Sequence, residues 1–338
     1  MILREFLYVD TDKVRAMLAQ LDGGVAEEER ETNTQEKRST VGPRSFAQHL
    51  QVTGSERYTQ KSLGDALFPT LEQALESEGL LKDLSEEVSD LSQWTSGAVR
   101  ESAPPGSLIR ITAMGSLFDT RYTASVFSAF ASVALGLQGM GVNLDPDASK
   151  GSSSKGKGRG GQQGPRPPRP KSGQAQLERQ LEDAIPEFAG VGGMDGDSLR
   201  SIIRMARGIF APGLHINLTP VDAGGVLIGS RLQEGRQYLD TEADILFARY
   251  GMEPQEWTLV GSVGSYGPED TTLPEFDFFR PDGTVNRARF ADNINGLMKT
   301  LGGMGFIDLP QHPGFSVIPF AVYRTIPLIA NLIAMRDS

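Results

Sequence analysis

The chain has 338 residues and a formal net charge of −10, and 38% of its residues are apolar and 22% charged. This composition is typical of a soluble globular protein, and the length allows one large hydrophobic core or two modest ones. Because no cysteine is present, disulfides and thiolate chemistry are excluded, and a reducing cytoplasm is the expected compartment.

The first two dozen residues predict a strand that leads directly into a helix. Residues 6–9 form an unbroken apolar run of β-favouring types, which is typical of a strand buried on both faces. Asp10 and Thr11 then offer N-cap side chains. An apolar helical stripe follows at i, i+3, i+4 and i+7: Val14, Met17, Leu18 and Leu21. No basic region precedes an apolar run here, so we expect no signal peptide.

Residues 26–62 are polar and predict a surface excursion that returns through a short strand at residues 50–58. Leucines then recur every fourth residue from Leu63 to Leu75, which predicts a helix that Gly79 stops. Pro69 lies within this pattern, so it either kinks the helix or marks its first turn.

A strand and a strongly apolar helix are predicted on the two sides of Asp119. After the turn signal Pro-Pro-Gly at residues 104–106, apolar and β-favouring residues continue to Phe118. The helix that follows, to about Leu137, is apolar on nearly all sides. We therefore expect it to be deeply buried or covered by a partner.

Residues 143–175 predict a disordered insertion, because a segment so rich in Gly, Ser, Pro and Lys buries too little apolar surface to offset its ordering entropy. Residues 150–171, here the basic arm, contain no acidic residue and leave the remainder of the chain with a net charge of −17. The charged residues of the arm are Lys150, Lys155, Lys157, Arg159, Arg166, Arg169 and Lys171. Two interpretations stay open: weak, non-specific binding of RNA or DNA, or a solvated loop that folds back on the acidic body.

The remainder of the chain predicts an alternation of helices and strands. The predicted helices cover residues 177–185, 198–209, 245–250 and 290–301, and the predicted strands cover residues 214–218, 226–228, 256–263 and 315–323. The apolar run at residues 315–335 is long enough to form a membrane span. Arg324 near its middle and two prolines favour a buried strand and a short terminal helix instead.

The pair Asp-Thr occurs three times where a predicted strand passes into a helix, at Asp10, Asp119 and Asp240. A short side-chain oxygen accepts the unpaired amide protons of a first helical turn, so we interpret all three as N-caps. The alternative is that the three carboxylates gather at one sheet edge as a metal or acid/base site.

The sequence predicts no cofactor and no metal. His49, His215 and His312 lack the local spacing of metal ligands, and structural histidines are favoured over a three-histidine site. Asp195 and Asp197 lack the remaining ligands of a calcium loop, so we interpret this segment as a turn that caps the next helix. The sequence contains no P-loop motif, no dinucleotide-binding motif and no nucleophile-elbow motif.

The opening residues carry a resemblance to a known family. Residues 4–10 (REFLYVD), Val14 and residues 18–24 (LAQLDGG) resemble the start of a family of uncharacterised bacterial proteins that is defined as a domain of unknown function. Further similarity lies in residues 107–119, 257–263 and 318–324. The resemblance implies a mixed α/β bacterial protein and brings no catalytic residues. A family of this kind also implies an accessory factor in bacterial defence or stress response.

These observations predict an α/β fold (mixed α+β) with two packed sheet-and-helix halves, residues 1–142 and 176–338, interrupted by the disordered basic insertion 143–175. The leading functional hypothesis is a non-enzymatic interaction or accessory protein with a protein partner. One alternative is a non-specific nucleic-acid-associated protein that acts through the basic arm, and another is an enzyme of unrecognised chemistry. We expect a cytoplasmic location and no membrane span.

Overall fold

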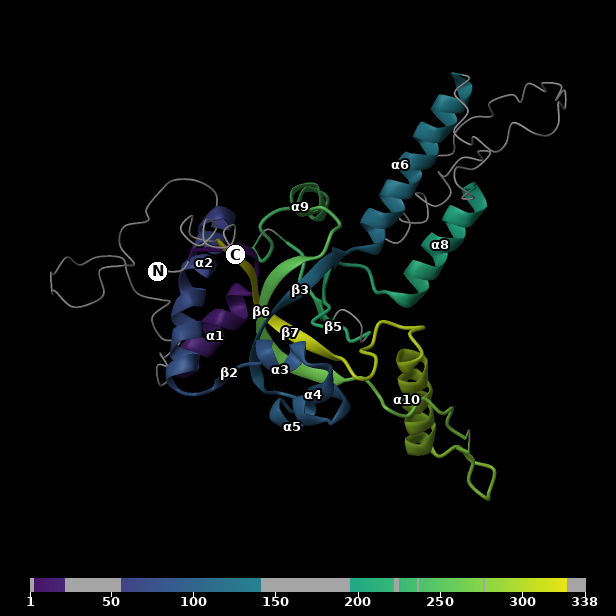
Figure 1. The fold of residues 1–338 in the computed structure, drawn as a ribbon. Coiled ribbons are helices and arrows are strands. Elements are labelled where there is room, and N and C mark those ends of the chain that lie inside the picture. Colours follow the sequence, from purple (N-terminus) through teal and green to yellow (C-terminus); the bar gives the residue numbers. More distant parts are fainter. Residues whose placement is uncertain are drawn as a thin grey trace, which may run out of the picture. The chain divides into compact units, whose positions relative to one another are not determined.

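The computed structural model describes residues 3–21, 56–140, 195–221, 225–235, 237–275 and 277–326. Its elements, in chain order, are β1 (Leu3–Val9), α1 (Thr11–Leu21), α2 (Glu56–Ser77), β2 (Leu81–Asp83), α3 (Ser85–Ser89), α4 (Leu91–Thr95), α5 (Ala98–Ser102), β3 (Leu108–Phe118), α6 (Thr120–Gly139), α8 (Gly196–Ile209), β4 (His215–Leu218), β5 (Ile228–Arg231), α9 (Ala243–Tyr250), β6 (Gln255–Tyr266), α10 (Arg287–Gly303) and β7 (Phe315–Ile326). The predicted mixed α/β class is confirmed (Figure 1).

The chain divides into two compact units. The first, here the sheet unit, comprises Met1–Phe118, Leu214–Gly305 and Leu309–Ser338. The second, here the helical unit, comprises Asp119–Gly213 and Phe306–Asp308. All described strands belong to the sheet unit, whereas α6 and α8 belong to the helical unit. The predicted boundaries at either end of residues 143–175 fall outside the described residues and stay predictions.

The sheet of the first unit closes on itself. β3 pairs with β4, β4 with β5, β5 with β7, β7 with β6, and β6 again with β3, while β1 extends from β7 and β2 from β3. Closure pairs backbone groups on both sides of these strands, which reduces the number of unpaired edges. Gly261 of β6 permits a close approach here, because a Cβ at this position would overlap the carbonyl oxygen of Ile318 on β7. Strands from before and after the insertion therefore share one sheet.

β1 confirms the prediction of a strand buried on both faces for Leu7, Tyr8 and Val9, whereas Phe6 is partly buried. One edge pairs antiparallel with β7. On the other edge, the amide of Val9 donates to the carbonyl of Tyr238, and the amide of Asp240 donates to the carbonyl of Leu7, each at 2.9 Å. Leu7, Tyr8 and Val9 are at most 2% exposed. The strand near the start of the chain is thus part of the core.

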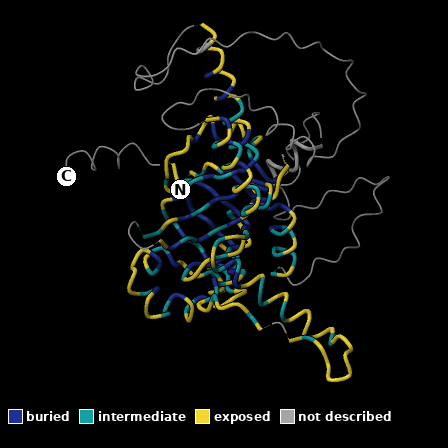
Figure 2. The backbone as a smooth tube through the Cα atoms, turned by 90° about the vertical axis from the view of Figure 1, so that its right-hand side faces the viewer, coloured by how far each residue is buried: buried dark blue, intermediate teal, exposed yellow. Residues whose placement is uncertain are grey.

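α1 and α2 pack on the sheet where β1, β6 and β7 lie side by side. The predicted stripe of α1 faces this core, with Val14 buried and the other three members partly buried. The rings of Phe6, Phe68 and Tyr323 contact one another with centroids 5.5 to 6.0 Å apart. In Figure 2 dark blue and teal segments gather at the centre of the tube trace, and exposed yellow segments lie around them.

The start of α2 corrects one prediction. α2 begins at Glu56, so the short strand predicted for residues 50–58 is wrong at residues 56–58, and residues 50–55 lie outside the described part of the chain. Pro69 lies inside α2 and does not mark its first turn. Its neighbours Phe68 and Leu71 are fully buried, so their packing holds the helix in spite of the one amide that proline lacks.

The later elements agree with the periodicity of the sequence. The helices predicted at residues 198–209, 245–250 and 290–301 are confirmed as α8, α9 and α10, and the strands predicted at residues 214–218, 256–263 and 315–323 are confirmed as β4, β6 and β7. The strand predicted at residues 226–228 is displaced: β5 covers Ile228–Arg231 and shares only Ile228 with the prediction. β7 ends at Ile326; the predicted terminal helix and the helix at residues 177–185 lie outside the described residues. Within the described ranges, no helix is both long and apolar enough to cross a membrane.

Candidate functional site

The basic arm cannot be placed in the structure. All seven of its charged residues, and His49, lie outside the described part of the chain. The nucleic-acid interpretation of the arm therefore stays a prediction.

Two of the three predicted caps are confirmed. Asp10 accepts a hydrogen bond from the amide of Lys13 at 3.0 Å, and its second oxygen accepts from Lys13 Nζ at 2.5 Å and from the Tyr8 hydroxyl at 3.4 Å. Asp119 accepts from the amide of Arg121 at 2.7 Å and from the guanidinium of the same residue at 3.2 Å. Both carboxylates are 2% exposed. Each caps the helix that follows it.

The interpretation of Asp240 as a cap is wrong. α9 begins only at Ala243, and Glu242 occupies its N-cap position without a side-chain hydrogen bond. The amide of Asp240 is bonded to the carbonyl of Leu7, so the chain at this point is still tied to the edge of β1. The carboxylate of Asp240 pairs with Arg249 on α9 instead.

The histidines and carboxylates do not assemble a metal site within the described ranges. His215 lies in β4, is 5% exposed, and has its ring centroid 6.4 Å from that of Phe118. Asp195 accepts from the amide of Ser198 at 2.8 Å and caps α8, as predicted. No group of three or more His, Cys, Asp or Glu side chains among the described residues is arranged to hold a metal ion. Asp10, Asp119 and Asp240 are therefore not among the described residues that could hold a metal ion together.

Glu72 of α2 is the centre of a buried charged cluster. This carboxylate is 2% exposed and accepts hydrogen bonds from Arg4 at 2.5 Å, from the Tyr323 hydroxyl at 2.8 Å and from Arg110 at 3.3 Å. Burial, and then the negative charge of Glu72, raise the pKa of Tyr323 above its ordinary value. Because Glu72 is fully engaged by donors from β1, β3 and β7, we interpret the cluster as a structural link between α2 and the sheet.

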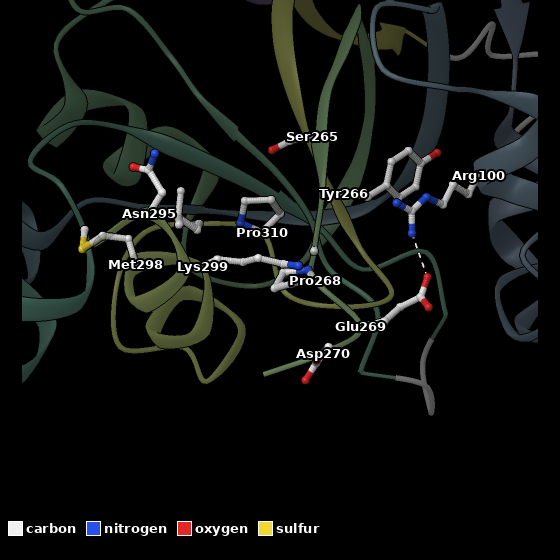
Figure 3. A pocket seen from close by; sticks show the side chains of 12 residues that line it. Arg100, Ser265, Tyr266, Pro268, Glu269, Asp270, Asn295, Met298, Lys299 and Pro310 are labelled. Carbon is white, nitrogen blue, oxygen red and sulfur yellow. Dashed lines mark hydrogen bonds and ion pairs between the residues drawn. The ribbon is translucent and has the colours of Figure 1, made fainter. Parts of the chain in front are cut away.

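An open pocket of about 680 Å³ lies where the end of β6 meets α10 (Figure 3). Tyr266 lines it from β6, Glu269 from the loop that follows, Asn295 and Lys299 from α10, and Arg100 from the segment before β3. In Figure 3, Arg100 and Glu269 lie on one side of the pocket and Asn295 on the other.

Tyr266, the tyrosine that lines the pocket, is not suited to act as a general base at neutral pH. Arg100 pairs with Glu269 at 2.7 Å and lies over the ring of Tyr266, 5.4 Å from its centroid. Burial raises the pKa of Tyr266 to about 12, against the lowering effect of Arg100. The hydroxyl donates to the carbonyl of Ala103 at 2.9 Å, so at neutral pH it is a neutral donor that is already engaged. A general base needs a pKa near the operating pH, and this phenol does not have one.

Sequence reasoning missed this pocket for a physical reason. Its lining comes from four separate stretches, around residues 100, 265–270, 295–299 and 309–310. No stretch has a motif of its own, because each contributes only one to six residues. The sole local signal was Gly-Pro at residues 267–268, which marks the turn after β6.

A second candidate surface is one face of α6 in the helical unit. Another face of the helix packs on α8, where three small residues of α6, Ala124, Ala131 and Ala134, meet Leu199 and Ile203. The exposed large apolar residues of this segment are Val126 at 41%, Phe130 at 36%, Val133 at 60%, Leu135 at 44% and Met140 at 73%. The expectation of a deeply buried helix is thus wrong. The alternative, a helix covered by a partner, stays a prediction.

The exposed face of α6 has a regular spacing and no charge. Apolar residues along this face recur at intervals of four and three, and we call them the α6 stripe: the exposed Val126, Phe130, Val133 and Met140 and the partly buried Leu137. From Tyr122 to Met140 the chain has no Asp, Glu, Lys or Arg. Exposed helical faces of soluble proteins normally carry such residues.

Comparison with known proteins assigns the chain to a family whose function is unknown. No curated protein and no solved structure matches it. A family model described as "Domain of unknown function (DUF6414)" matches residues 3–323, a range that begins with β1 and ends in β7. This match confirms that the chain belongs to an uncharacterised family; the opening motif itself stays a prediction. The chain belongs to the DUF6414 family of domains of unknown function.

Proposed function

We propose that this protein is a non-enzymatic interaction protein that binds an apolar helix of another polypeptide on the α6 stripe. The supporting observation is the exposed, uncharged face of α6, with Val133 at 60% and Met140 at 73% exposure. Contiguous exposed apolar surface is uncommon on soluble monomers and marks interaction sites. A helix that presents its own apolar face is the partner that such a stripe accommodates, because neither side then buries an unpaired charge.

The hydrogen bonds of the buried acidic side chains in the described ranges favour a structural role for these side chains over a catalytic one. Asp10 and Asp119 cap helices, and Glu72 holds Arg4, Arg110 and Tyr323. A catalytic carboxylate has to present a free oxygen to a substrate in a cleft. The carboxylate oxygens of these three residues instead accept hydrogen bonds from other groups of the same chain.

The test is affinity purification of the tagged full-length protein from its native host, followed by mass spectrometry. Val133→Glu places a charge in the middle of the stripe, and Ser132→Glu places the same charge on the adjacent residue, which is exposed on a different face of α6. We expect at least one protein to be recovered with the wild type and with Ser132→Glu and to be lost with Val133→Glu. Identical recovery with all three baits would contradict the proposal.

The cellular setting that we propose is the bacterial cytoplasm. The absence of cysteine supports a reducing compartment. A role as an accessory factor in defence or stress response follows only from the kind of family to which the chain belongs, and the identity of the partners recovered above would test it.

The second candidate function is non-specific binding of nucleic acid through the basic arm. The observation in its favour is the contrast between an arm with seven positive charges and a remainder with a net charge of −17. Phosphate neutralisation by such an arm gives affinity without sequence preference. Its dependence on salt, argued in the Discussion, is the test.

A further inference from the structure

The pocket where the end of β6 meets α10 is built by a single unit of the protein. All of its lining residues belong to the sheet unit. The hydroxyl of the buried Thr300 on α10 donates to the carbonyl of Thr272 at 2.7 Å, which ties the helix to the loop after β6. Gly303 permits a close approach, because a Cβ at this position would lie 2.5 Å from the side chain of Thr271. The helix and the loop, which both line the pocket, are therefore held together before any ligand binds.

The lining of the pocket carries two positive and two negative side chains. Arg100 and Glu269 form a complete ion pair at 2.7 Å on one side of the pocket (Figure 3). The other two charged residues are Lys299 on α10 and Asp270 on the loop after β6. The lining as a whole has no net charge, so it does not select a ligand of one sign.

Lys299 and Asp270 carry opposite charges that are not joined by a direct ion pair. Among the described residues, Lys299 makes no hydrogen bond and no ion pair. One oxygen of Asp270 accepts from the amide of Thr272 at 2.8 Å. Hydrogen bonds from Thr272 are the largest cause that lowers the pKa of Asp270, and the charge of Lys299 lowers it further. The two charges are thus near enough to act on each other and leave room between them.

Asn295 adds a polar group beside Lys299. It lies one turn earlier on the same face of α10, and its side-chain amide makes no hydrogen bond within the described ranges. The apolar part of the lining consists of Pro268, Met298, Leu309 and Pro310. The pocket therefore offers an ammonium, an amide, a carboxylate and an apolar surface.

We propose that this pocket binds a small zwitterion with an apolar side chain, the chemical class of the α-amino acids. The carboxylate of the ligand pairs with Lys299 and accepts from Asn295, and its ammonium pairs with Asp270. A ligand with only one charge leaves one of these partners unpaired, which gives the site its selectivity. The volume of about 680 Å³ is within the usual range for small-molecule sites. This inference does not depend on the α6 stripe or on the proposed function.

The first experiment titrates the purified full-length protein by isothermal calorimetry with leucine and with phenylalanine. Each amino acid is compared with two analogues that keep its side chain and lack one charge. These are isocaproate and isoamylamine for leucine, and phenylpropionate and phenethylamine for phenylalanine. We expect at least one of the amino acids to bind, and both of its analogues to bind about fivefold or more weakly, because each analogue loses one charged contact.

The second experiment assigns each charge of the ligand to its partner. Lys299→Gln should weaken binding of the amino acid by about fivefold or more and leave binding of the amine analogue unchanged. Asp270→Asn keeps an oxygen for the amide of Thr272. It should weaken binding of the amino acid to a similar degree and should not weaken binding of the carboxylate analogue.

The chain offers a matched control for each substitution. Lys82→Gln changes a lysine on β2 that is 43% exposed and does not line the pocket. Asp282→Asn changes an aspartate that accepts from the amide of Thr284 at 2.9 Å, just as Asp270 accepts from Thr272, and that also lies outside the lining. We expect both controls to bind the amino acid like the wild type. Thermal melting of all four variants checks that the fold is retained.

Three results would overturn this inference. The first is no binding of either amino acid up to about 10 mM, well above a millimolar dissociation constant. The second is equal binding of an amino acid and one of its singly charged analogues. The third is binding that Lys299→Gln and Asp270→Asn leave unchanged, which would place the ligand elsewhere. None of these results bears on the proposed function, whose test depends on Val133→Glu and the recovery of host proteins.

Discussion

At the scale of single residues, Asp10 shows how one side chain serves both a helix and a buried network. It caps α1 through the amide of Lys13, and its second oxygen receives the ammonium of Lys13 and the hydroxyl of Tyr8. We expect Asp10→Ala to lower the free energy of unfolding by about 0.5–2 kcal/mol, towards the upper end because the site is 2% exposed. Urea denaturation measures this change.

The control for this prediction is Asp10→Asn, which keeps an oxygen for the cap and loses the charge. Asp10→Asn should lower the free energy of unfolding by less than Asp10→Ala does, since asparagine is among the best N-caps. An unchanged melting temperature together with a loss of biological activity would contradict a purely capping role and would point to a function for the carboxylate.

Among the acidic residues, Glu72 is predicted to cause the largest loss of unfolding free energy when it is replaced. Glu72→Ala leaves Arg4 and Arg110 without their shared buried partner, and the two side chains are only 20% and 25% exposed. We expect a loss of about 3 kcal/mol in unfolding free energy, at the low end for a broken buried pair because both arginines retain contact with water. Chemical denaturation measures it.

Glu76 is the matched control, since it also pairs with Arg110 but is 46% exposed. Glu76→Ala should cost less than about 1 kcal/mol. Equal effects of the two substitutions would mean that the burial of Glu72 does not matter.

The buried tyrosines predict a loss of stability at alkaline pH. Burial is the main cause that raises the pKa of Tyr250 and of Tyr266 from 10.0 to about 12. A raised pKa means that the folded protein binds the phenolic proton more tightly than the unfolded chain, so this contribution is complete below pH 10.0 and is lost as the pH rises towards 12. We expect tyrosinate absorbance between these values to be lower in the native protein than in the urea-unfolded chain.

Tyr266→Phe is the control for this titration. It should remove one late-ionising group and leave the others. Native and unfolded spectra that titrate together would show that these phenols are open to solvent.

At the scale of elements, β1 is predicted to be indispensable. It pairs with β7 on one edge and with the segment around Leu239 on the other, and α1 and α2 pack beside it. We expect deletion of residues 1–9 to abolish soluble expression, because it removes Leu7, Tyr8 and Val9 from the core and exposes an edge of β7. A soluble truncated protein with a cooperative thermal transition would refute this.

Secondary structure was predictable at this scale where one periodicity dominated. The runs at residues 256–263 and 315–323 became β6 and β7, and the stripe beginning at Val14 became the buried face of α1. The short helices α3, α4 and α5 had no prediction, because each has five residues and no full period. Their stability comes from packing, as for Trp94, whose indole nitrogen donates to the carbonyl of Val88 at 2.9 Å.

At the scale of the whole molecule, the basic arm is predicted to be separable from the fold. Deleting residues 150–171 should leave the melting temperature nearly unchanged, because a shorter connection changes mainly the entropy of loop closure. If all seven charges contact duplex DNA, the slope of log affinity against log salt should approach about −6, and a single strand should give about −5.

Titration of labelled RNA and DNA at two salt concentrations, with and without the arm, measures this contribution. We expect weak binding or none, since the remainder of the chain carries a net charge of −17. Absence of binding at low salt eliminates the nucleic-acid candidate. Equal binding after deletion would place the contact elsewhere on the chain.

The candidate sites differ in how far the sequence could reveal them. The apolar, uncharged character of α6 could be predicted from the sequence, because it is a property of consecutive residues. Its exposure was not, since that depends on whether other segments cover the helix. The pocket beside Tyr266 was invisible, because Arg100, Glu269 and Lys299 meet only after the chain has folded.

The sequence by itself determined the mixed α/β class, the place of most helices and strands, and the caps at Asp10 and Asp119, because these depend on neighbours within a few residues. The tertiary structure alone decided that β3, β4, β5, β7 and β6 close into a ring, that Glu72 gathers Arg4, Arg110 and Tyr323, and that Asp240 pairs with Arg249 instead of capping α9. These outcomes join residues from distant parts of the chain. No local pattern encodes which strand a backbone edge will meet or which donor a buried carboxylate will find.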